Sequence, residues 1–227
     1  MHATSEMVIH ASVPNEGRVA EVLNGRHGRR FRRSLEREGR DFTRLLRKWI
    51  YPRLSYTIRK IDSTEGGAVT LQGGTVLKSS KLARVLRGCH DLLCFIATIG
   101  PGIDENIRRF TSQNRLTDMY ALDAIGSTAI EDVVDTFHTM MRDTLRKEVK
   151  GVSLRFSPGY CDWPVTEQKK LFALVDPARI DVTLLPSFLM LPRKSVSGVF
   201  GIGADIQRPP YNPCFHCGKH SCKERRS

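Results

Sequence analysis

The 227-residue sequence lacks features that mark several broad protein classes. No stretch approaches the roughly 20 apolar residues that a membrane-spanning helix requires, so no membrane is expected as a partner. The N-terminus carries no basic segment followed by an apolar run, which argues against a secretion signal. Three of the six cysteines are scattered and three crowd the end of the chain, unlike the even framework of a secreted disulfide scaffold. These absences predict a soluble, cytoplasmic protein.

Common catalytic motifs are also missing. The sequence contains no G-x-S-x-G, no phosphate-binding loop and no H-E-x-x-H. The segment 195–203 (SVSGVFGIG) contains G-x-G, but it lacks the full dinucleotide fingerprint and no helix is predicted after it. A buried strand with close backbone packing explains these glycines equally well.

Acidic residues are few compared with basic ones: 24 Asp and Glu stand against 36 Lys and Arg, which gives a net charge of +12. Such a charge attracts acidic partners: nucleic acid, an anionic membrane surface or an acidic protein. In the most basic stretch, residues 26–60, apolar residues from Phe31 to Trp49 recur on one face of a helix that Pro52 ends. An ordinary solvated face or a steering surface for a partner both explain its arginines, Arg32, Arg33, Arg37, Arg40, Arg44 and Arg47.

Strands and helices are intermixed without a regular βαβ rhythm, which predicts the α+β class with a mixed or antiparallel sheet. Hydrophobic periodicity and turn residues predict strands at 54–61, 68–77 (a hairpin around Gly73-Gly74), 92–99 and 152–156, and a second hairpin of 182–190 with 195–204. They predict helices after Ser79 or Ser80, after Gly102, at 116–148 with a possible break at Gly126, and at 165–174.

A cluster that could bind a ligand follows the strand predicted at 152–156. There the chain passes directly into Ser157-Pro158-Gly159, a turn in which the backbone can approach a ligand closely. Arg155 could hold a carboxylate through two parallel hydrogen bonds, and Tyr160 offers a ring and a hydroxyl. An ordinary turn with a surface arginine explains the same residues.

The C-terminal tail is rich in metal-binding side chains. Cys214, Cys217 and Cys222, with His220 or His216, could surround a zinc ion or ligate an iron–sulfur centre. The second half of this pattern is compressed, and no second C-x-x-C completes a standard zinc ribbon. A tail of reduced thiols is the alternative.

Two segments resemble a known family. Residues 155–174 (RFSPGYCDWPVTEQKKLFAL) resemble the R-x-x-x-G-Y segment of the activation domain of cobalamin-dependent methionine synthase, and residues 187–198 (SFLMLPRKSVSG) resemble that domain's later segment ending in S-V-S-G. The stretches 80–107 and 122–135 resemble free-standing relatives of the domain. The resemblance covers roughly residues 30–205. It implies three parts of the chain: an unassigned segment at 1–25, an activation-type domain at 26–206 and the Cys/His-rich tail at 207–227.

The resemblance also implies a function. Domains of this family bind S-adenosylmethionine and dock over an inactive cob(II)alamin, where one electron, typically from flavodoxin, and a methyl group restore methylcobalamin. The chain would thus be a component of a methionine synthase-type methyltransferase. Because the sequence contains no cobalamin-, folate- or homocysteine-binding module, a corrinoid-binding protein or other methionine synthase modules are expected as partners, beside an acidic electron donor.

Residue roles follow from the same resemblance. Arg155 is expected to bind the methionine carboxylate of S-adenosylmethionine, and the backbone around Phe156 and Gly159 is expected to contact the ligand. Tyr160 is expected near the cobalt face of the docked corrinoid, as the residue closest to the chemistry. Glu131 resembles a family glutamate near this site, although a solvated helix acid would look the same in the sequence.

Two other functions compete with this one. The basic helix and the tail are compatible with a nucleic-acid-binding protein that carries a small metal-binding tail. Against it, no aromatic and basic RNA-binding motif such as K/R-G-F/Y-G is present. A structural subunit that has lost ligand binding is the other possibility, and the intact Arg155, Gly159 and Tyr160 argue against it.

Overall fold

The computed structural model describes residues 21–22, 24–148, 150–204, 206, 212 and 215, and the backbone alone of residues 7–9, 26 and 27. Its elements follow in the order β1 (Met7–Ile9), α2 (Arg26–Arg37), α3 (Phe42–Trp49), β2 (Arg53–Ser63), β3 (Ala68–Leu71), β4 (Val76–Lys78), α4 (Ser80–Val85), β5 (Asp91–Thr98), α5 (Gly102–Ser112), α6 (Leu116–Arg146), β6 (Gly151–Val152), the 3-10 helix η1 (Val165–Glu167), α7 (Gln168–Leu174), the 3-10 helix η2 (Pro177–Ile180), β7 (Thr183–Leu184), β8 (Met190–Leu191) and β9 (Ser195–Gly203).

An antiparallel sheet forms the centre of the fold. Its strands have the order β4-β3-β2-β5-β9-β6, and β1 pairs with β2 beside this path. The central strand β5 pairs along its length with β2 on one side and with β9 on the other. The α+β class is confirmed, and every described strand pairing is antiparallel.

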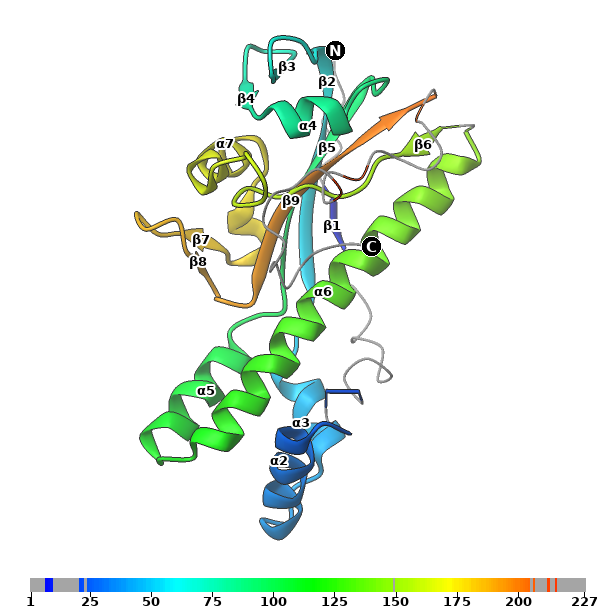
Figure 1. Cartoon of the computed structure of the whole chain (residues 1–227). Coiled ribbons are helices and arrows are strands. Elements are labelled where there is room, and N and C mark those ends of the chain that lie inside the picture. Colours follow the sequence, from blue (N-terminus) through cyan, green and yellow to red (C-terminus); the bar gives the residue numbers. More distant parts are fainter. Residues whose placement is uncertain are drawn as a thin grey trace.

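Both faces of the sheet are covered, which explains why β5 is an almost continuous apolar run. Successive side chains of a strand point to opposite faces. Leu93 and Phe95 therefore pack with α6 in one core, and Leu92 and Cys94 pack with α4 and α7 in a second core. Figure 1 shows α6 passing the sheet and continuing beyond it to α2, α3 and α5.

The basic N-terminal stretch forms two helices, so the prediction of one helix closed by Pro52 is wrong. Gly39 adopts a positive φ of 66° after α2, and the Asp41 side chain caps α3 by accepting a hydrogen bond from the backbone of Arg44. The apolar face is confirmed, because Phe31 and Leu35 are fully buried against the core. The four residues between the helices let both keep that face turned inward.

The predicted central helix is confirmed, and the possible break at Gly126 is absent: α6 is continuous over 31 residues. Gly126 has a packing role, since a Cβ there would lie 2.8 Å from Cγ2 of Ile103 and 3.1 Å from Cε of Lys194. Near the N-terminal end of α6, Asp118 accepts hydrogen bonds from Ser34 of α2 and from Arg115. These contacts fasten the N-terminal helices to α6.

The hairpin predicted from 182–190 and 195–204 is also wrong. β7 and β8 pair with each other in a separate two-stranded sheet, and β9 joins the main sheet between β5 and β6. Burial gives the physical reason, since β9 is enclosed on both faces and needs the central position. Apart from the strand predicted at 152–156, the other predicted elements form close to the expected residues, including the Gly73-Gly74 turn and the Ser79 cap of α4.

Candidate functional site

The segment predicted as a strand at 152–156 forms only two strand residues followed by an irregular edge. β6 pairs with the end of β9, and Ser153 then donates its backbone N–H to Gly201 O at 2.9 Å. Pairing resumes where Phe156 meets Val199. Between these two contacts the edge segment advances three residues, from Ser153 to Phe156, while β9 advances two, from Gly201 to Val199. The edge segment therefore contains one extra residue, which forms a β-bulge. Bulges redirect side chains and are common beside functional sites.

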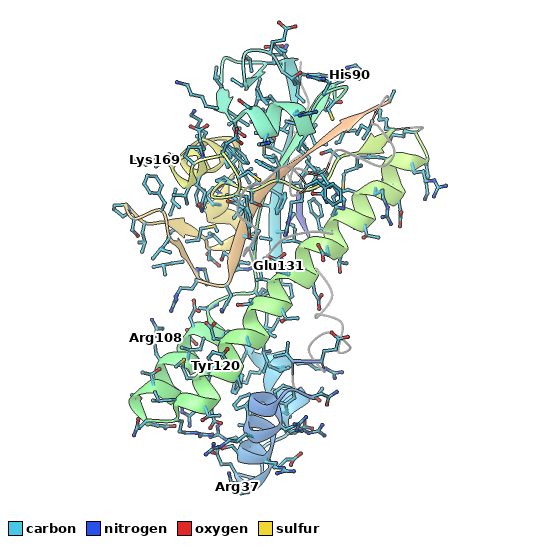
Figure 2. All side chains as sticks on the ribbon, viewed as in Figure 1. Arg37, His90, Arg108, Tyr120, Glu131 and Lys169 are labelled. Atoms are coloured by element: carbon cyan, nitrogen blue, oxygen red, sulfur yellow. The ribbon has the colours of Figure 1, made fainter. Side chains whose placement is uncertain are left out.

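The bulge places Arg155 against the long helix. Its Nη2 lies 2.6 Å from Oε2 of Glu131, which comes from the middle of α6. The Arg155 side chain is 10% exposed and that of Glu131 is 33% exposed, so the pair joins a mostly buried cation to an anion that reaches solvent. Figure 2 shows Glu131 where α6 passes the sheet. Two residues that are 24 positions apart in the sequence thus form one charged pair.

The loop after Arg155 is closed by its own backbone. Tyr160 N–H donates to Ser157 O at 3.2 Å, and Gly159 N–H donates to Trp163 O at 2.8 Å. Gly159 has a φ of 93°, a conformation that side chains disfavour. Below the loop, Phe156 stacks on the buried Trp163 with 5.8 Å between ring centroids. The result is a rigid turn that holds the Tyr160 side chain 38% exposed.

Two acids that the sequence analysis did not single out anchor this loop. Asp162 accepts a hydrogen bond from Ser79 Oγ at 2.6 Å, and Glu167 accepts one from Lys170 Nζ at 2.7 Å and one from the Lys78 backbone at 3.0 Å. Burial acts to raise the pKa of Glu167, but these hydrogen bonds hold that pKa below its ordinary value. No local sequence pattern marks these acids, because their partners Ser79 and Lys78 lie more than 80 positions away in the sequence.

The two segments that carry the family resemblance meet at Gly198. A Cβ on this residue would lie 2.8 Å from Ser157 Oγ and 3.0 Å from Phe156 O, so β9 can approach the loop only with a glycine here. Gly201 and Gly203 have similarly close neighbours around Cys89 and Gly88. The glycines of 195–203 therefore serve close backbone packing, which is the second of the two interpretations that the sequence allowed.

The structure brings the expected ligand-binding residues to one edge of the sheet. Arg155 and Glu131 touch, and Gly159 and Tyr160 lie in the adjoining turn. The Phe156 side chain is buried and its backbone N–H and C=O both bond to Val199. Phe156 thus holds the site in place through its backbone. The ligand roles of these residues stay predictions.

The expected metal ligands Cys214, Cys217, Cys222 and His220 lie outside the described residues. Among the residues that the structure does describe, no three His, Cys, Asp or Glu side chains gather as a metal site. Burial raises the pKa of both Cys89 and Cys94 to about 12, so these thiols are poor nucleophiles. No helix in the described ranges is long and apolar enough to span a membrane.

Comparisons with known proteins bear on this arrangement. A family model described as "Vitamin B12 dependent methionine synthase, activation domain" matches residues 82–219, more than half of the chain. The chain belongs to this activation-domain family. The matched range contains Glu131, Arg155 and Tyr160, and it begins after α2 and α3.

A solved structure gives the activation domain a fold neighbour. The crystal structure of the MetH reactivation domain bound to AdoHcy is 17% identical to this chain, with a TM-score of 0.63. The match covers 91% of this chain and 81% of that one. A search of curated proteins found no match. The comparisons give no support to the nucleic-acid-binding alternative.

Proposed function

We propose that this activation domain binds S-adenosylmethionine between α6 and the 155–160 turn and presents its methyl group to a corrinoid carried by a methionine synthase-type partner. The Arg155–Glu131 pair is the observation that carries the proposal. The family match supports the reaction class, and the AdoHcy bound to the MetH reactivation domain supports the ligand class.

The charges of the site fit the amino-acid end of this ligand, which carries a carboxylate and an ammonium group. Arg155 supplies a fixed guanidinium that can take a carboxylate through two hydrogen bonds, and its low exposure strengthens that interaction. Glu131, on the solvent side of the pair, supplies the anion for the ammonium group. In the free protein each side chain serves as the other's counterion, which keeps the mostly buried arginine paired.

The turn has a different role, since Tyr160 lies on its exposed side. When bound, S-adenosylmethionine supplies the methyl group and the partner's corrinoid supplies the cobalt nucleophile. Tyr160 would face the docked corrinoid, and the rigid backbone from Ser157 to Trp163 would hold the ring at a constant height above the site. Gly159, which has no side chain, leaves the ligand room beside the turn.

The partners follow from this role. The corrinoid is held by a separate binding protein or methionine synthase module, and an acidic electron donor such as flavodoxin would reduce it. A net charge of +12 favours encounters with acidic proteins. Cytoplasmic thiol conditions suit the free cysteines Cys89 and Cys94. In the tail, Cys214, Cys217, Cys222 and His220, which lie outside the described residues, are candidate ligands of a zinc ion or an iron–sulfur centre.

Calorimetric titration with S-adenosylmethionine tests the proposal. The unmodified protein should bind, and Arg155→Ala should lose about 1.5–3 kcal/mol, which is roughly ten- to more than hundredfold in affinity. Arg193→Ala, which removes an exposed arginine in the loop before β9, is the matched control and should bind normally. Absence of binding by the unmodified protein, or equal binding by Arg155→Ala, would refute the proposal.

A further inference from the structure

The arginines from Arg29 to Arg40, on α2 and in the segment after it, fall into two groups. Arg32 pairs with Glu36 at 3.0 Å and Arg40 pairs with Glu38 at 3.5 Å, so these cations have carboxylate partners. The second group lies beside α2 around a hollow of about 840 Å³, and its described lining consists of Arg29, Arg30, Arg33, Glu36 and Arg37. Within the described ranges, no carboxylate forms an ion pair with Arg30, Arg33 or Arg37.

The position of this arginine hollow follows from the helix period. Arg30, Arg33 and Arg37 recur at steps of three and four residues and share one face of α2. Phe31 and Leu35 lie on the opposite face, where both are fully buried. Burial of the apolar face therefore turns the arginines outward together. Figure 2 shows Arg37 at the end of the helical part that lies away from the sheet.

A row of like charges is unfavourable on a bare helix. Cations at these spacings repel each other. A mixture of acidic and basic side chains would keep this face equally well solvated without that repulsion. A ligand that brings several anions into the hollow removes the repulsion. Guanidinium groups suit such a ligand, because each can hold a carboxylate or a phosphate with two parallel hydrogen bonds.

We infer that the arginine hollow is a docking site for an acidic segment of a partner protein. The hollow is open to solvent and runs along one face of α2, which suits a chain segment that lies along the helix. Single-stranded nucleic acid is usually held with aromatic side chains that stack on bases. None of the exposed aromatic residues in the described part of the chain lines the hollow. The site lies on α2 and is independent of the Arg155–Glu131 pair and of the proposed ligand.

Fluorescence anisotropy with labelled decaglutamate tests the inference on the full chain. At about 20 mM salt the unmodified protein should bind this peptide, and the affinity should fall as salt approaches about 200 mM. The variant R30E/R33E/R37E should lose about tenfold or more in affinity, since it reverses the charges that line the hollow. It should bind S-adenosylmethionine as the unmodified protein does, which separates this test from that of the proposed function.

The matched control makes the same change in net charge elsewhere. Arg142, Arg146 and Lys147 are exposed at the far end of α6, and R142E/R146E/K147E should weaken decaglutamate binding by less than about threefold. Equal losses in the two triple variants would show attraction by overall charge only, and no binding by the unmodified protein would remove the site; either result overturns the inference. A decauridylate RNA is the second probe. If it binds more tightly than decaglutamate through the same arginines, the hollow serves nucleic acid and the inference is wrong.

Discussion

Replacing Gly198 by alanine should strain the contact between β9 and the candidate site. The added Cβ would lie 2.8 Å from Ser157 Oγ and 3.0 Å from both Phe156 O and a ring carbon of Phe95. The Phe156 oxygen cannot yield freely, because it accepts the Val199 N–H at 2.8 Å. Overpacking of this kind costs about 1–3 kcal/mol. For a chain of this size that is a fall in melting temperature of about 2–12 °C.

Thermal unfolding and calorimetry measure the two expected effects. The Gly198→Ala protein should melt lower, and its affinity for S-adenosylmethionine should fall because the residues after Arg155 are pushed outward. Gly151→Ala is the control: this glycine lies in β6 on the same edge, and its nearest neighbour for a Cβ is the Ile206 side chain at 3.2 Å. A Gly198→Ala protein that melts within about 1 °C of the unmodified chain and keeps its ligand affinity would refute the close-packing argument.

Three further predictions concern the pair, the thiols and the tail. Glu131→Ala should lower the free energy of unfolding by about 1–3 kcal/mol, measured by urea denaturation, because it removes the carboxylate partner of the mostly buried Arg155. No change would mean that water replaces the carboxylate at no cost. In the native protein at pH 8, iodoacetamide should label the exposed Cys161 and spare the buried Cys94, whose pKa of about 12 keeps it protonated. Peptide mass spectrometry that finds Cys94 labelled as fast as Cys161 would refute this prediction. Truncation after Ile206 should leave the melting temperature nearly intact, and a large stability loss would instead indicate a metal site that holds the fold together. Elemental analysis of the anaerobically purified full chain distinguishes a metal-binding tail from a tail of reduced thiols.

Local signals in the sequence were enough for elements with a local cause. The Gly73-Gly74 pair places two positive φ angles in the β3–β4 turn, and Ser79 caps α4 through its own side chain. The six central residues of β5, 92–97, are apolar on both faces, which is typical of a strand with a core on each side. In each case the residues that decide the structure are neighbours in the chain.

The sequence-based predictions failed where the structure depends on contacts with residues far away in the sequence. The apolar period from Phe31 to Trp49 continues through Gly39, so periodicity alone could not show that the chain breaks there. The partners of β9 are β5, about a hundred residues earlier, and β6, whereas the sequence suggested the nearest preceding strand as its partner. The bulge at Arg155 exists only through the register between Phe156 and Val199. The residue types of the site were thus visible in the sequence, but their contacts were not.

The unbroken α6 helix sets a fixed distance between two parts of the molecule. Its Asp118 bonds to Ser34 on α2, and its Glu131 meets Arg155. These two residues are thirteen positions apart, or about 20 Å along the axis of a helix that rises about 1.5 Å per residue. Because α6 is continuous between them, it fixes the distance from α2 to the Arg155–Glu131 pair. A partner held at α2 would reach the proposed S-adenosylmethionine site only with a surface of matching span, so α6 would select partners by length as well as by charge.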